Sequence, residues 1–279
     1  MIMTLRIYAS TRKITPFTES SLTGDFLQAV STVYNENKID IRLYMPKYGF
    51  ISDRKYILRE VIRLKEIPVP YKDGEIVPSV KSAFIPETRV QVYFLVYPEL
   101  FKKITRPIAE SHDLSQYEQW ESCTAIFDHT AIQTLEYLYW QPDIMLCCNT
   151  ESALIPYLLK KSYHDKEWYK PTKPVLLLSQ DMVFKGIRQE ILDEYHIDTG
   201  DENLSDPLEL LKSAITHSHA VILLDHPDMS YLSDLLSEAS VAKLLKQKGE
   251  QYLKLSIENP DENTWNDMAK QVYHFLESI

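Results

Sequence analysis

Glycine is scarce in this chain of 279 residues, which contains only six. None of the six belongs to a G-x-G-x-x-G or Walker-type loop, in which glycine lets the backbone approach a phosphate group closely. The sequence therefore shows no intact phosphate-binding loop, and we expect no cofactor.

Basic side chains are outnumbered by acidic ones. The 30 Lys and Arg residues stand against 40 Asp and Glu residues, which gives a formal net charge of −10. Nucleic-acid binding depends on clustered Lys and Arg that neutralise phosphates. A nucleic-acid partner is therefore not expected.

Cysteine is rare, and long apolar runs are missing from the amino-terminal region. An odd set of three cysteines, Cys123, Cys147 and Cys148, gives no disulfide framework and predicts free, buried thiols. The apolar run at residues 5–9 is far shorter than the roughly 20 residues that span a bilayer, and no signal-peptide pattern is present. We expect a cytoplasmic protein with no membrane partner.

The sequence lacks the usual catalytic and metal-binding patterns. It has no G-x-S-x-G, no Cys/His pair and no zinc spacing, so no catalytic residue and no metal site are predicted. His217 and His219 could serve as metal ligands with Asp225 or His226. Their place before a strand favours loop histidines instead, and Asp225 is expected to cap a helix.

Apolar runs typical of buried strands alternate with helical patterns. This alternation predicts an α/β fold with three layers and a doubly wound, mostly parallel, Rossmann-like sheet. We expect a single domain over residues 1–279, with a β-rich excursion around 55–96. The predicted strands are 5–9, 39–44, 57–64, 75–84, 89–96, 144–148, 175–179 and 220–225, and the predicted helices are 25–35, 114–140, 150–160, 206–216 and 227–248.

A last helix is predicted after Asn259. Asn259 would be its N-cap, Pro260 its first residue and Glu262 the partner in a capping box. A well-capped terminal helix is what a complete domain would have.

Two segments carry a family resemblance. Residues 142–156, P-D-I-M-L-C-C-N-T-E-S-A-L-I-P, resemble the P-D-I-I-H-x-N-D-W-x-x-A-L-I-P signature of glycogen and starch synthases. Residues 42–49, R-L-Y-M-P-K-Y-G, resemble the V-R-V-x-M-P-R/K-Y-G strand and loop of the same family. The resemblance runs from residue 5 to the last helix and covers only the first of the family's two domains. It is strongest to the short single-domain forms of Bacteroidetes-type bacteria, and it implies the amino-terminal half of a GT-B glycosyltransferase fold.

The likeness fails where the family grips its nucleotide-sugar diphosphate. The family's K-x-G-G-L-x-D-V loop falls on residues 19–26, with Glu19 in place of Lys and Ser21 and Leu22 in place of the glycine pair. Phosphates are held by close backbone N–H groups, a helix amino terminus and a cation. Glu19 would repel them, so this donor loop is degenerate.

The active-site positions differ as well. Leu146 stands where the family has His, and Asn149 and Thr150 replace its Asp and Trp. In the loop at 178–186, Gln180 occupies the place of the active-site His. Glutamine carries neither a proton nor a positive charge near neutral pH.

Four residues remain candidate ligand contacts. The side chains of Asn149, Gln180 and Asp181 could hydrogen-bond sugar hydroxyls, and Tyr48 could stack on a pyranose ring. The alternative is that they complete strand ends, cap helices and pack.

Three functions stay open. The first is a glycogen-synthase-like domain without autonomous catalysis that binds a glucan, a sugar or a protein partner. The second is a glucosyltransferase that uses ADP-glucose or UDP-glucose and is completed by a separate domain or a homodimer. The third is a structural or interaction protein.

Overall fold

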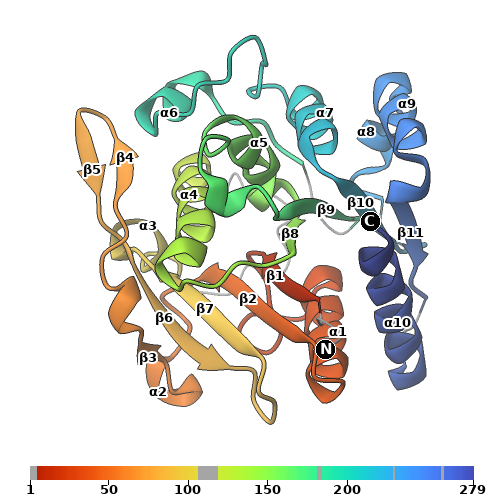
Figure 1. The fold of residues 1–279 in the computed structure, drawn as a ribbon, viewed down its shortest axis with the longest axis horizontal. Coiled ribbons are helices and arrows are strands. Elements are labelled where there is room, and N and C mark those ends of the chain that lie inside the picture. Colours follow the sequence, from red (N-terminus) through yellow and green to blue (C-terminus); the bar gives the residue numbers. More distant parts are fainter. Residues whose placement is uncertain (1–4, 106–118, 181–183, 229, 259–260) are drawn as a thin grey trace.

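The computed structural model describes residues 5–105, 119–180, 184–228, 230–258 and 261–279. Its centre is a nine-stranded sheet in the order β11-β10-β9-β8-β1-β2-β7-β6-β3 (Figure 1). Strand β6 runs antiparallel to both of its neighbours, and the other pairs are parallel. The strands are β1 (Arg6–Ser10), β2 (Asp40–Pro46), β3 (Arg59–Glu60), β6 (Ser79–Phe84), β7 (Gln91–Val96), β8 (Ile144–Cys148), β9 (Lys173–Ser179), β10 (Ala220–Asp225) and β11 (Tyr252–Ser256).

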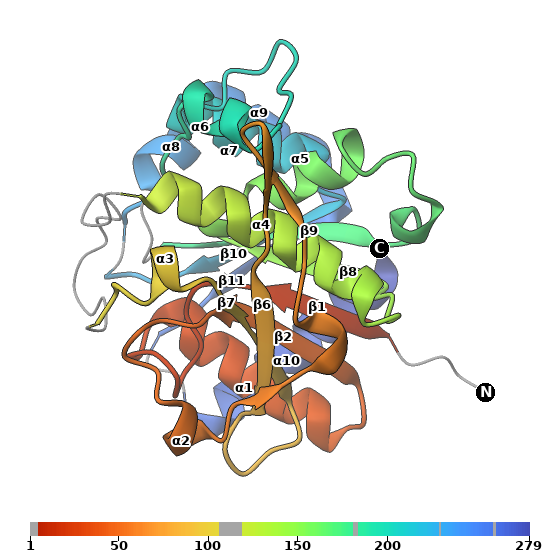
Figure 2. The same cartoon turned by 90° about the vertical axis from the view of Figure 1, so that its left-hand side faces the viewer.

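Helices cover both faces of the sheet, which confirms the predicted three-layer α/β fold. Helices α1 and α10 pack together on one face, while α4, α5 and α7 pack in series on the other (Figure 2). The helices are α1 (Leu22–Glu36), α2 (Asp53–Tyr56), α3 (Pro98–Phe101), α4 (Trp120–Tyr137), α5 (Leu154–Lys161), α6 (Gln189–Glu194), α7 (Pro207–His217), α8 (Ser233–Ser237), α9 (Ala239–Lys248) and α10 (Glu262–Ser278).

The strand order reverses at β1. From β1 the chain passes through α1 to β2 on one side, whereas from β8, the other neighbour of β1, it passes through α5 to β9 on the opposite side. The carboxyl ends of β1 and β8 therefore flank the topological switch point, where open α/β sheets bind their ligands.

The central strands form the core. All five residues of β8 are buried, as expected for a parallel strand covered on both faces. The three cysteines are free and buried, as predicted. Burial raises the pKa of the Cys123 thiol to about 11, so this side chain stays a thiol near neutral pH.

The region from 55 to 96 departs from the predicted strands. Residues 57–64 do not form one strand, because Ile57 has a left-handed φ of 53° and only Arg59–Glu60 pairs, with β6. The predicted strand 75–84 is two strands. The first, β5 (Gly74–Ile76), pairs with β4 (Val69–Tyr71) in a separate hairpin, and the second is β6.

The predicted helix at 227–248 is also wrong. It is replaced by α8 and α9, which are separated at Glu238 by an extended ψ of 131°. Edge strand β11 and the short helix α6 were not predicted. The burial pattern along β11 shows only one fully buried residue, Leu255, so the apolar signal that marks the inner strands is weak there.

The last helix starts later than predicted. Helix α10 begins at Glu262, and its N-cap is Asp261, whose side chain accepts a hydrogen bond from Thr264 N at 2.8 Å. The predicted cap residues 259 and 260 lie outside the described residues, as does residue 114, the expected start of α4. Across the described ranges, no helix is both long enough and apolar enough to cross a bilayer.

Gly49, in the M-P-K-Y-G segment of the resemblance, is required by close packing. A Cβ added there would lie 2.2 Å from the carbonyl oxygen of Lys102, whereas a Cβ on Gly74 would meet nothing within 4 Å. We predict that Gly49→Ala lowers the free energy of unfolding by about 2 kcal/mol, and that Gly74→Ala changes it by less than about 1 kcal/mol. Urea unfolding of the two variants measures both changes. Equal stability of the two would contradict this packing.

Candidate functional site

The carboxyl ends of β8 and β9 and the amino end of α1 meet at Asn149. Its Oδ1 accepts a hydrogen bond from Ser179 N at 2.8 Å, and its Nδ2 donates to Thr23 Oγ1 at 2.9 Å. Its own backbone N donates to Leu177 O at 2.8 Å. Asn149 is 3% exposed. One buried amide therefore ties the sheet to the helix at the switch point.

The backbone of Asn149 is strained. Its φ of 59° and ψ of −163° lie in a region that glycine adopts and other residues avoid. Such a conformation persists only where surrounding contacts hold it, and it clusters at ligand sites. The two side-chain hydrogen bonds of Asn149 supply those contacts here.

The amino end of α1 holds the degenerate donor loop. The helix begins at Leu22, three residues earlier than predicted, so Ser21 is its N-cap and not part of a loop. Ser21 Oγ accepts a hydrogen bond from Gly24 N at 3.1 Å. Leu22 is the first helical residue and is buried. The glycine pair of the family is thus replaced by a capped and packed helix start.

A carboxylate also lies in the first turn of α1. Asp25 Oδ1 accepts a hydrogen bond from Thr15 Oγ1 at 2.6 Å, and its Oδ2 accepts one from Ser20 Oγ. The positive end of a helix dipole attracts anions. Asp25 matches the Asp of the family's K-x-G-G-L-x-D-V loop, so this carboxylate does not distinguish the chain from the family.

Little free space remains beside Glu19. The cavity there has a volume of about 10 Å³, which is about the space of one water molecule. Its lining residues are Arg12, Lys13, Thr18, Glu19, Ser20, Tyr48 and Phe50.

Tyr48 packs inside this corner. It is 2% exposed, its hydroxyl donates to Arg12 O at 3.2 Å, and its ring stacks on Phe50 with centroids 5.3 Å apart. The ring is therefore covered in this structure.

Gln180 connects the ends of β9 and β10. Its Oε1 accepts a hydrogen bond from Leu232 N at 3.2 Å, and its Nε2 donates to Asp225 Oδ1 at 3.5 Å. The predicted helix cap by Asp225 is wrong, because no helix begins at 227 and Asp225 instead forms a salt bridge with Lys254 at 2.6 Å. Asp181 lies outside the described residues.

The remaining motif positions are apolar or already bonded. Leu146 is a core residue of β8 with 3% exposure. Thr150 Oγ1 donates to Lys185 O at 3.1 Å and accepts from Lys185 N at 3.2 Å. These side chains join the strand end to the segment after β9.

Two buried ionisable side chains, Arg12 and Asp128, were not predicted. Arg12 and Asp128 are 4% and 0% exposed. Arg12 Nη2 donates to Thr124 Oγ1 at 2.7 Å, and Asp128 Oδ2 accepts from Leu154 N at 3.1 Å. Burial raises the pKa of Asp128, although Arg12 acts in the opposite direction. The available signal was an acidic residue, Asp128, inside the predicted helix 114–140.

The histidines do not form a metal site. Within the described ranges no group of three or more His, Cys, Asp or Glu could hold a metal ion. His217 is the last residue of α7, so it lies on a helix and not in the predicted loop, and its Nε2 lies 2.8 Å from Glu202 Oε1.

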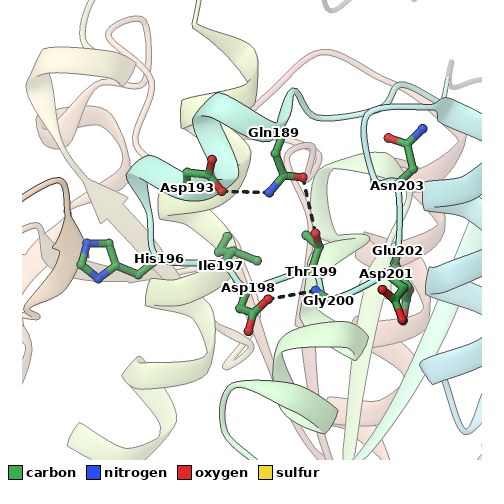
Figure 3. A pocket seen from close by; sticks show the side chains of 10 residues that line it. All are labelled: Gln189, Asp193, His196, Ile197, Asp198, Thr199, Gly200, Asp201, Glu202 and Asn203. Atoms are coloured by element: carbon green, nitrogen blue, oxygen red, sulfur yellow. Dashed lines mark hydrogen bonds between the residues drawn. The ribbon is translucent and has the colours of Figure 1, made fainter.

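A larger cavity lies along α6 and the loop that follows it (Figure 3). Its volume is about 680 Å³. Its side chains are mostly amides and carboxylates, several already bonded to neighbours, such as Gln189 Nε2 to Asp193 Oδ1 at 2.8 Å. The lining residues are Gln189, Asp193, His196, Ile197, Asp198, Thr199, Gly200, Asp201, Glu202 and Asn203.

A family model described as the starch synthase catalytic domain matches residues 6–247. The chain belongs to this family. It is 28% identical over 266 residues to a glycogen synthase of Chlorobium phaeovibrioides, covering 91% of this chain and 52% of that protein. A glycogen synthase of Pelodictyon phaeoclathratiforme is 26% identical over 269 residues, covering 93% and 54%. The predicted resemblance is confirmed.

A solved structure supports the fold. The catalytic domain of starch synthase IV from Arabidopsis thaliana, bound to ADP and acarbose, superimposes with a TM-score of 0.69 at 15% identity, covering 91% of this chain and 52% of that one. This likeness confirms the expected family fold. The chain spans about half the length of the curated relatives it matches.

The Asn149 contacts predict an ordered series of stabilities. Asn149→Ala should lower the free energy of unfolding by about 3 kcal/mol, because buried partners lose their hydrogen bonds and a strained φ remains. Asn149→Gly should retain about 1 kcal/mol more, because glycine tolerates that backbone. Thr23→Val, which removes only one partner, should cost about 1 kcal/mol. Chemical denaturation gives the order, and an Ala variant at least as stable as the Gly variant would refute it.

Proposed function

We propose that this glycogen-synthase-like domain has no autonomous glucosyltransferase activity and binds a glucan or a related sugar. The observation that carries the proposal is the amino end of α1. There Glu19, the Ser21 cap and the buried Leu22 occupy the places of the lysine and the glycine pair of the family's diphosphate loop.

Electrostatics supports this reading. A nucleotide-sugar diphosphate carries negative charge, and its binding needs a cation and close backbone donors. Glu19 offers charge of the same sign, and the cavity beside it has a volume of only about 10 Å³. Nucleotide-sugar binding by this chain alone would be weak.

The motif positions support the loss of catalysis. Leu146 offers no polar atom, and the amide of Gln180 contacts Leu232 and Asp225. Neither side chain can exchange a proton in the way that the family's histidines can. No residue of the chain is proposed as catalytic.

A sugar remains the preferred ligand class. The matching relatives are glycogen synthases, and the matching structure holds ADP and acarbose. Sugar hydroxyls need neutral amides and carboxylates and no cluster of cations. Tyr48, Asn149, Gln180 and Asp181 stay predicted contacts, although the first three would have to give up packing or hydrogen bonds to reach a ligand.

One observation favours the second hypothesis. Because the chain spans 52% of a glycogen synthase, a separate domain or a second copy could complete a transferase that uses ADP-glucose or UDP-glucose. The reading as an interaction protein predicts instead one stoichiometric protein partner and no response to sugars. A cytoplasmic location fits each of these proposals.

Thermal unfolding with added ligands separates the hypotheses, because a ligand that binds only the folded state raises the midpoint. We expect glycogen or maltooligosaccharides to raise it, and millimolar ADP-glucose and UDP-glucose to leave it unchanged. A shift with a nucleotide sugar would contradict the proposal and favour the transferase. No shift with any ligand would favour a protein partner.

The role of the α1 loop can be tested by charge reversal. We predict that Glu19→Lys increases the affinity for ADP by roughly tenfold, because it replaces repulsion of the diphosphate by attraction. Glu36→Lys at the other end of α1 makes the same change in net charge and should leave ADP binding as it is. Isothermal titration of the two variants gives the comparison. Equal responses would show that the loop is not the barrier.

A further inference from the structure

Basic side chains gather at the amino ends of the strands, opposite the carboxyl ends that flank the switch point. Strands β9 and β10 begin there, and the end of α10 lies beside them (Figure 1). We name this group the amino-edge cluster. It consists of Lys160 in the last turn of α5, Lys173 at the start of β9, His219 just before β10, and Lys248 at the end of α9.

Hydrogen bonds to main-chain oxygens fix three of these four residues in place. The backbone N of His219 donates to Pro174 O at 2.7 Å, which sets His219 beside Lys173. Lys248 Nζ donates to Ser218 O at 2.6 Å, and Lys173 Nζ donates to Ile279 O at 2.6 Å. An ammonium group has three N–H donors, so each of these two lysines retains donors for a further partner.

The cluster is a local concentration of positive charge. Among the described residues, none of its lysines forms a salt bridge with an acidic side chain; the Ile279 oxygen compensates part of the charge of Lys173. Burial together with Lys173, Lys248 and Lys160 lowers the pKa of His219. Burial and Lys160 likewise lower the pKa of Lys248.

This arrangement is unfavourable without a counter-charge. The chain as a whole has a net charge of −10, yet like charges lie together here on three secondary-structure elements and one connecting segment. Repulsion between like charges destabilises a fold, whereas an anion placed among them would receive charge-assisted hydrogen bonds. Asp143, whose backbone O accepts a hydrogen bond from Lys173 N at 2.9 Å, forms a salt bridge with Arg6, and Glu202 is paired with His217.

We propose that the amino-edge cluster binds a small oxyanion of the phosphate class, either free phosphate or a phosphate ester. The ligand would accept hydrogen bonds from the remaining ammonium donors and from the His219 ring. This site is separate from the α1 loop and does not depend on the proposed glucan binding, because it lies at the opposite ends of the strands.

The first test compares inorganic phosphate with chloride at equal ionic strength. We expect phosphate to raise the unfolding midpoint saturably, by about 2 °C, through preferential binding to the folded state. In Lys160→Met, which removes an exposed cation without a salt bridge, the apparent affinity should fall about fivefold. Lys246→Met, on the exposed face of α9, is the matched control and should respond like the unmodified chain.

A second readout does not depend on stability. Proton NMR of the His219 ring should show its pKa rising when phosphate binds, because a nearby anion favours the imidazolium form. A phosphate ester such as glycerol phosphate, in a parallel titration, distinguishes an ester site from a free-phosphate site. The proposal is overturned if phosphate and chloride act alike, if the His219 pKa does not rise, or if Lys160→Met binds phosphate as well as Lys246→Met does.

Discussion

The hydrogen bonds of Asn149 hold the switch point of this fold together. Its amide joins Ser179 of β9 to Thr23 of α1 across the end of β8, and these bonds keep a backbone conformation that favours glycine. Because the same strand ends and the same helix start would surround a ligand, the geometry of the switch point depends on this buried side chain. In this structure these contacts engage both the oxygen and the nitrogen of the Asn149 amide.

Other residues around the switch point likewise bond or pack within the protein. Ser21 caps the helix that would bind a phosphate, Gln180 holds the segment after β10, and Leu146 belongs to the core. The chain thus keeps the family's fold while these polar groups bond within it, and a shared fold does not by itself carry an activity. The amino-edge cluster places positive charge at the amino ends of the strands, away from the carboxyl ends that flank the switch point.

The sequence predicted the framework better than the site. Long apolar runs such as Ile144–Cys148 are buried on both faces, so their strand state follows from composition alone. Edge strand β11 and the region around Ile57 were missed because half-exposed segments carry little pattern and because a left-handed φ at isoleucine leaves no sequence signal. The motif spacing located Asn149 and Gln180, but their partners Thr23 and Leu232 are 126 and 52 residues away, and only the folded chain reveals them.

The measurement that tests the central claim most directly is glucose transfer by the purified chain. Radiolabelled ADP-glucose and UDP-glucose are offered with glycogen as acceptor, and a full-length glycogen synthase is assayed in parallel. The Ser21 cap at the helix start, Glu19 in place of the loop lysine and the core residue Leu146 in place of histidine together predict no incorporation above the protein-free control. Incorporation that grows with the concentration of this chain alone would contradict the account.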